Sequence, residues 1–216
     1  MKNLRFECVD NKLHILGYPT ADKVLELPDT HISKQLKDMI LHQFDLNSSI
    51  DFMQSIPSNS DIVRIGLVNS AIVSYYKCFG SNKSRHNKLM KKKALFGLPK
   101  DAGDVFDYYK GIRDRFIAHD NSRYTQVYAG VIIESTKLKP FVDILATAFV
   151  ADIARVDELQ SFFNLISVTV EWVDKEIDKL MELLKNEYNS YSIQDFQHFN
   201  EIIYSTPSSN ELNSNR

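Results

Sequence analysis

The strongest structural constraint in this sequence is a repeat of apolar residues near its C-terminal end. Apolar side chains recur there at alternating intervals of three and four residues: Val156, Leu159, Phe163, Ile166, Val170, Val173, Ile177, Leu180 and Leu184. This spacing places them along one side of an α-helix. The segment from 156 to 184 therefore predicts one long helix, on the order of 43 Å at 1.5 Å per residue, with one face available for packing.

Three upstream segments also have helical spacing. The first, from Asp29 to Pro57, has its stripe at Ile32, Leu36, Met39, Gln43, Leu46, Ile50 and Met53. The second, "DIVRIGLVNSAIVSYYKCFG", follows Ser58 and Ser60, either of which can cap it, and is apolar nearly all round, which predicts a central buried helix. The third begins near Asp101 or Asp104, with its stripe at Val105, Tyr109, Ile112 and Phe116.

Two segments favour β-structure instead. "NKLHILGYPT" near the N-terminus resembles a strand and a turn, and "YTQVYAGVIIEST" is rich in β-branched and aromatic residues. We expect residues 124–154 to form an insertion with a small β element, in which "FVDILATAFVADIA" is helical. The sequence thus predicts a mainly α protein, a helical bundle. Its expected parts are an extended segment over 1–28, a helical domain over 29–204 and a disordered tail over 205–216.

Composition places the chain among ordinary soluble proteins, with 44% hydrophobic and 25% charged residues. Its first residues carry charges where a signal peptide needs an apolar run, and aspartates interrupt its longest apolar segment, so a cytoplasmic location is expected. Cys8 and Cys78 lie far apart without companion motifs, which predicts neither a disulfide nor a zinc site. No phosphate loop, paired metal ligands on a helix or serine elbow occurs, and neither a cofactor nor a metal is expected.

Charge is distributed unevenly along the chain. Residues 81–100, "SNKSRHNKLMKKKALFGLPK", hold seven basic residues and no acidic one; the remaining 19 basic residues face 28 acidic ones, a net charge of −9. Six of the seven are candidate RNA contacts: Lys83, Arg85, Lys88, Lys91, Lys92 and Lys93. A basic segment on an acidic body can draw a polyanion to one place. A solvated loop that keeps the protein soluble explains the same pattern.

The stretch "YYKGIRDRFIAHDNSR", residues 108–123, holds the candidate catalytic residues Arg113, Asp114 and His119. At about 100° per residue, Arg113 and His119 border opposite sides of the apolar stripe of the third helix, and Asp114 points away from it if the helix stays regular. The residues "HDNS" suggest that the helix ends at His119. A packing or capping role for the arginine and the histidine is the structural alternative.

The order of these residues resembles the signature of the HEPN superfamily. In that signature an arginine, usually followed by Asn or Asp, precedes a histidine by four to six intervening residues on a helix of an α-helical bundle. Arg113, Asp114 and His119 match it, with five residues between the arginine and the histidine. The specific resemblance covers residues 100–123, and the helical layout extends it over most of 29–190.

This resemblance implies metal-independent RNA cleavage by a homodimer in which both copies of the motif line one cleft. His119 would move protons, Arg113 would bind the phosphate, and Asp114 would orient one of them. A microbial toxin or defence effector, with an antitoxin or regulatory protein as partner, is the expected setting. Tyr108, Tyr109 and Tyr124 could stack on bases, or belong to the core.

Two other functions remain open. A non-catalytic interaction module would use the helix over 156–184 to dimerise or to hold another protein, with the motif as a structural pair. Alternatively, the basic segment would bind nucleic acid without cleaving it.

Overall fold

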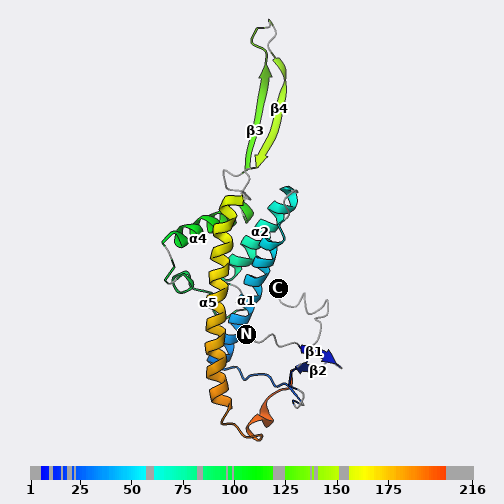
Figure 1. Ribbon diagram of the computed structural model, residues 1–216. Helices are drawn as coiled ribbons and strands as arrows, with labels where there is room; N and C mark the ends of the chain where they lie inside the picture. The colour runs from blue at the N-terminus through cyan, green and yellow to red at the C-terminus, as the bar shows by residue number, and fades with distance from the viewer. Residues whose placement is uncertain are drawn as a thin grey trace. The chain divides into compact units, whose positions relative to one another are not determined.

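A computed structural model of the chain (Figure 1) describes residues 6–9, 12–15, 17–18, 21, 23–56, 61–81, 85–95, 97–98, 100–118, 125–136, 138, 141–150 and 156–202. The elements, in chain order, are β1 (Phe6–Val9), β2 (Lys12–Ile15), α1 (His31–Gln54), α2 (Asp61–Lys77), α3 (Lys91–Ala94), α4 (Lys100–Ile112), η1 (Arg113–Ile117), β3 (Thr125–Ile133), β4 (Phe141–Val150), α5 (Val156–Tyr188) and η2 (Asp195–His198). The protein is mainly α-helical with small β elements, as the sequence predicted. The predicted tail over 205–216 lies outside the described residues.

The chain divides into two compact units, one made of Met1–Lys37 with Glu176–Arg216 and the other of Asp38–Lys175. In the first unit, β1 and β2 form an antiparallel hairpin. Its extended residues also meet the end of the described chain, since Glu26 donates its backbone N–H to the carbonyl of Asn200 at 2.7 Å and Ile202 donates to Val24 at 2.9 Å. Residues 24–26 and 200–202 are thus joined by backbone hydrogen bonds.

Helix α1 begins at a side-chain cap. The hydroxyl oxygen of Thr30 accepts the backbone N–H of Ser33 at 3.1 Å, and the hydroxyl of Ser33 accepts the N–H of Thr30 at 2.9 Å. This reciprocal pair satisfies amides that the first turn of a helix leaves without partners. The start of α1 is therefore fixed locally, two residues after the predicted start at Asp29.

Aromatic side chains from three helices form the core of the second unit. Tyr109 of α4 stacks on Phe162 of α5 with ring centroids 4.3 Å apart, and Tyr75 of α2 meets Phe162 edge-on at 5.5 Å. The hydroxyl of Tyr75 lies 3.1 Å from that of Thr169, which is also buried. Rings in these orientations contribute about 0.5–1.5 kcal/mol per pair beyond the burial of their area. The core therefore ties α2, α4 and α5 together.

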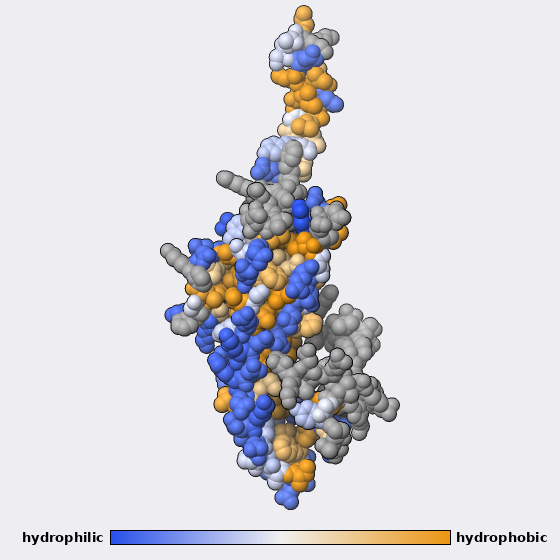
Figure 2. Space-filling view, in the orientation of Figure 1, coloured by the Kyte–Doolittle hydropathy of each residue, from blue (hydrophilic) through white to orange (hydrophobic). Residues whose placement is uncertain are grey.

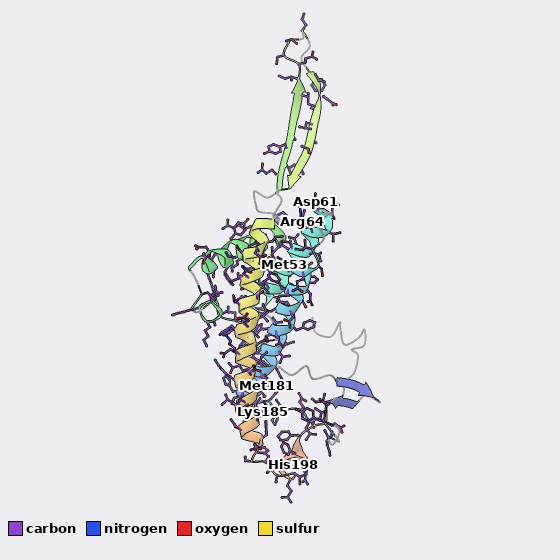
Figure 3. The ribbon with its side chains drawn as sticks, in the orientation of Figure 1. Met53, Asp61, Arg64, Met181, Lys185 and His198 are labelled. Carbon is purple, nitrogen blue, oxygen red and sulfur yellow. The ribbon has the colours of Figure 1, made fainter. Side chains whose placement is uncertain are left out.

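The long helix predicted near the C-terminal end is confirmed, whereas the prediction for α2 needs a correction. Helix α5 spans the predicted repeat and buries Leu159, Ile166, Val173, Ile177, Leu180 and Leu184. The prediction that α2 is buried along its whole length is wrong for its first turns, where the side chain of Ile62 is 86% exposed. Figure 3 labels Asp61 and Arg64 in this part of the helix, and the two side chains form an ion pair at 3.0 Å.

The prediction of a helix in "FVDILATAFVADIA" is wrong for residues 141–150, which form strand β4. It pairs antiparallel with β3, so that Val127 lies opposite Ala148 and Val131 opposite Ile144. Its aromatic and β-branched residues suit a strand, and the neighbouring β3 satisfies its backbone hydrogen-bonding groups. Residues 151–154 lie outside the described part of the chain. The predicted β element in this insertion is therefore present, and larger than expected.

Candidate functional site

The motif begins where α4 changes its pitch. Asp101 lies in the first turn of α4, where the negative charge of its side chain interacts favourably with the helix dipole. Further along the helix, Phe106, Tyr109 and Ile112 are buried. From Arg113 to Ile117 the chain forms a π-helical turn, η1, in which Ala118 donates its N–H to the carbonyl of Arg113 at 2.9 Å. Single π turns are rare and often occur at functional sites. The helix therefore does not stay regular through the motif, because its α-helical part ends at Ile112.

The guanidinium of Arg113 is held from two sides. Its Nε donates to Oδ1 of Asp114 at 2.6 Å, and Nη2 pairs with the same carboxylate. On the other side, Nη1 donates to the backbone carbonyl of Tyr76 at 3.4 Å, and the guanidinium carbon lies 5.6 Å from the centre of the Tyr76 ring. The side chain is still 28% exposed. Arg113 is thus a positioned cation that solvent can reach.

Asp114 lies between two cations. Besides Arg113, its carboxylate accepts a hydrogen bond from Nζ of Lys110 at 2.7 Å. Burial by itself would raise the pKa of Asp114, but the hydrogen bonds from Lys110 and Arg113 outweigh it and hold this pKa below its ordinary value. The carboxylate is therefore ionised at neutral pH and serves to orient Arg113. His119 lies outside the described residues.

The tyrosines near the motif differ in exposure. Tyr109 is buried in the core against Phe162, whereas Tyr108 meets the edge of the Tyr109 ring and is exposed. Tyr124 lies outside the described residues. Only Tyr108 of the two described tyrosines thus presents its ring at the surface.

Arg85 of the basic segment is engaged inside the bundle. Its guanidinium forms an ion pair with Asp45 of α1, and its side chain is only 5% exposed. It also donates to the backbone carbonyls of Leu41 and Lys77, both at 3.2 Å. These contacts occupy Arg85 in fixing the segment to α1 and to the end of α2. Lys83 lies outside the described residues.

The remaining lysines of the segment are closer to solvent. Nζ of Lys91 contacts the carboxylate of Asp107 at 2.7 Å and lies 4.9 Å from the centre of the Phe106 ring, which links α3 to α4. Lys88, Lys92 and Lys93 are exposed. Gly97, at a φ of +78°, allows the turn that leads from α3 into α4. An exposed group of lysines thus lies on the same unit as Arg113.

A buried polar face on α1 escaped the sequence prediction. Its members are Asp38, His42, Asp45 and Ser49. The carboxylate of Asp38 accepts the backbone N–H groups of His86 and Asn87 at 3.1 and 2.8 Å, and Ser49 donates its hydroxyl to the carbonyl of Ala71 at 2.8 Å. The spacing of four, three and four residues is itself helical, and it could have revealed this face.

Burial shifts the pKa of His42 on this face and the pKa of Cys78 next to it. Desolvation lowers the pKa of His42, and the positive charge of the neighbouring Arg85 lowers it further. The hydrogen bond to the Asn87 carbonyl raises this pKa, but the net shift is downward. Nε2 of His42 lies 3.0 Å from the carbonyl oxygen of Asn87, which only accepts, so this nitrogen carries the proton of a neutral ring. Burial raises the pKa of Cys78 to about 12, which keeps its thiol protonated and unreactive.

Among the described residues, no group of three or more His, Cys, Asp or Glu side chains is placed to hold a metal ion, and no helix is both long and apolar enough to cross a membrane. A depression of about 210 Å³ lies between the start of α4 and α5, lined by Leu98, Asp101, Ala102, Val105, Ser161, Asn164, Leu165 and Val168. Arg113 is not among its lining residues. The chain matches no family model, and no curated protein or solved structure is significantly similar to it.

Proposed function

We propose that the protein is a metal-independent endoribonuclease of HEPN type, which acts on RNA as a homodimer in the cytoplasm of a microbial cell, as a toxin or defence effector. The observation that carries the proposal is the state of Arg113. Its guanidinium is oriented by Asp114 and by the Tyr76 carbonyl, yet its side chain is 28% exposed. A cation that is already fixed in place stabilises developing negative charge without reorganisation during the reaction.

The chemistry assigns one role to each motif residue. The ribose 2′-hydroxyl loses its proton and attacks the adjacent phosphorus, the bond to the 5′-oxygen breaks, and that oxygen gains a proton. His119 accepts or donates one of these protons, because an imidazole has both forms near neutral pH. Arg113 binds the phosphate oxygens as charge builds on them, and Asp114 keeps the guanidinium in position. The motif of a second copy completes the site.

The basic segment supplies attraction for the strand. Lys88, Lys92 and Lys93 are exposed on the unit that carries Arg113. Lysines that contact phosphates release counterions and bind single strands with a strong dependence on salt. Arg85 has a different part in the proposal, since its ion pair with Asp45 holds the segment in place.

Cleavage of a mixed-sequence RNA in the presence of EDTA tests the proposal. The purified wild-type chain should produce fragments with 2′,3′-cyclic phosphate ends, and both His119→Ala and Arg113→Ala should lose this activity. Arg115→Ala is the matched control, because Arg115 is exposed on the same turn and should be dispensable. Far-UV circular dichroism confirms that each variant is folded.

The opposite result would overturn the proposal. A folded, dimeric wild-type chain that leaves RNA intact and harms no host cell is not a ribonuclease. If His119→Ala then lowers only the melting temperature, the motif is structural and the protein is a non-catalytic interaction module. The structure does not favour this alternative. The module would bind its partner through the apolar stripe of α5, and most of that stripe is already buried within the chain.

A further inference from the structure

The hairpin of β3 and β4 has one face that is apolar over three successive residue pairs. Side chains alternate between the two faces of a strand, and the register pairs Val127 with Ala148, Ala129 with Ala146 and Val131 with Ile144. These six residues share one side of the hairpin: Val127, Ala129, Val131, Ile144, Ala146 and Ala148. We name this set the apolar face. It contains no charged or hydrogen-bonding side chain.

The opposite face differs in chemistry. Ile132 lies opposite Asp143 there, and Tyr128 lies opposite Thr147 and donates its hydroxyl to Gln126. This side therefore carries a charge and several polar groups. In an antiparallel sheet with one polar and one apolar face, the apolar face is normally the one packed against another layer.

No element in the described part of the chain covers the apolar face. The side chain of Val127 is 75% exposed, that of Val131 60% and that of Ile144 58%, and the three alanines are exposed too. In Figure 2 the middle of the hairpin is coloured mainly as hydrophobic, with hydrophilic residues beside it and toward its two ends. A lone two-stranded hairpin is marginally stable in water, and a contiguous apolar patch on a protein surface commonly marks an interface. The hairpin is therefore incomplete without a covering surface.

We propose that a second copy of this chain covers the apolar face, so that two hairpins stack face to face around a two-fold axis. A face without charge can meet its own copy without repulsion, as an isologous interface requires. The alternation of large and small side chains along the apolar face also lets two copies interdigitate. With the axis between the Ala129–Ala146 pair and the Val131–Ile144 pair, Val131 and Ile144 of one hairpin lie over Ala129 and Ala146 of the other, and large side chains meet small ones.

The size of the face suits this partner. Each strand rises about 3.4 Å per residue, so the apolar face is about 14 Å long and the whole hairpin, with nine residues in β3, is about 30 Å long. Stacking two hairpins over their full length removes on the order of 1,000 Å² from solvent, which is at the lower limit of a specific interface. Pairing of strand edges alone would leave the apolar face in water, so stacking of faces is the arrangement that removes the exposure. This inference goes beyond the proposed function and does not depend on RNA cleavage.

Sedimentation velocity of the full chain at micromolar concentrations tests the proposal with two neighbouring substitutions. Val131→Glu places a carboxylate on the apolar face beside the proposed two-fold axis, where two copies bring like charges together, and should weaken dimerisation by at least about 100-fold. Ile132→Glu makes the same chemical change on the opposite face, at a side chain that is 44% exposed, and should leave the dimer intact. Circular dichroism checks that the helices of both variants melt as in the wild-type chain.

Three results would overturn the proposal. The first is a monomeric wild-type chain. The second is a dimer that tolerates Val131→Glu, or one that both substitutions weaken equally, because the apolar face is then not the specific contact. The third is a monomeric chain that co-sediments with phosphatidylcholine and phosphatidylglycerol vesicles and loses that binding in Val131→Glu, which would make lipid the covering surface.

Discussion

The helical core and the β3–β4 hairpin use apolar side chains in opposite ways. In the core, the rings of Tyr75, Tyr109 and Phe162 are buried and contact one another. In the hairpin, Val127 and Val131 lie in water. The comparison teaches that the helices complete their packing within one chain, whereas the hairpin does not. Stability should therefore depend on the core, and association on the hairpin.

The largest expected effect on stability comes from removing an aromatic ring from the core, compared with removing one from the hairpin. Phe162→Ala removes a side chain that contacts rings on two helices and should lower the free energy of unfolding by about 3–5 kcal/mol. Phe141→Ala, at an exposed position of β4, should change it by less than about 0.5 kcal/mol. Urea unfolding followed by circular dichroism measures both. Equal losses would show that the hairpin belongs to the cooperative core.

The next effect separates buried from exposed charge within the basic segment. Arg85→Ala leaves the buried carboxylate of Asp45 with Lys77 as its remaining cation and should cost about 3 kcal/mol of stability. Lys92→Ala removes an exposed charge and should stay within about 0.5 kcal/mol of the wild-type protein. Thermal and urea unfolding of the two variants decide the matter. A stable Arg85→Ala protein would mean that the segment is not anchored through Asp45.

A smaller effect should come from pH. Because the pKa of His42 is lower in the folded chain, the unfolded chain takes up its proton first as pH falls, and the folded state loses stability below the ordinary histidine pKa of about 6.5. The slope for this one proton is at most about 1.4 kcal/mol per pH unit. His42→Gln keeps a donor for Asn87 and should remove this contribution. Unfolding measured between pH 7 and pH 5 in the two proteins gives the difference, and identical slopes would contradict it.

The smallest change in stability is expected where the proposed function predicts a change in binding. Replacing Lys88, Lys92 and Lys93 together by Gln should alter stability by less than about 0.5 kcal/mol per site. It should weaken RNA binding and reduce the slope of log affinity against log salt by about 0.7 for each phosphate that a lysine no longer neutralises. Fluorescence anisotropy at several salt concentrations, with the inactive His119→Ala background, measures this slope. An unchanged slope would show that these three lysines do not contact the RNA.

Helices were predictable where apolar spacing alone determines the element. The repeat from 156 to 184 gave α5, since its stripe is both long and regular. The same criterion failed for β4, because Phe141, Ile144, Leu145 and Ala148 are spaced as on a helix and only the pairing with β3 decides the structure. Local sequence does not contain that partner.

The candidate site was predictable only in part, for a related reason. Arg113 and Asp114 follow from the motif, but no residue type in "RDRFI" specifies the π turn in which they lie. The polar face of α1 was missed because a search for apolar residues passes over Asp38 and His42. Both side chains are buried, and their hydrogen-bond partner Asn87 lies in a loop distant in sequence. Burial of polar groups is a property of the assembled fold.

The short run from Arg85 to Lys93 has a consequence for how this protein can diverge. Its first three residues are bound to α1 by Arg85 and by the carboxylate of Asp38, while three of the lysines that follow extend into solvent. Substitutions at those lysines leave the architecture untouched, so selection can change the surface charge of this segment without first having to preserve folding. Substitutions at Asp38, Asp45 or Arg85 lack this freedom, and related chains should vary there far less.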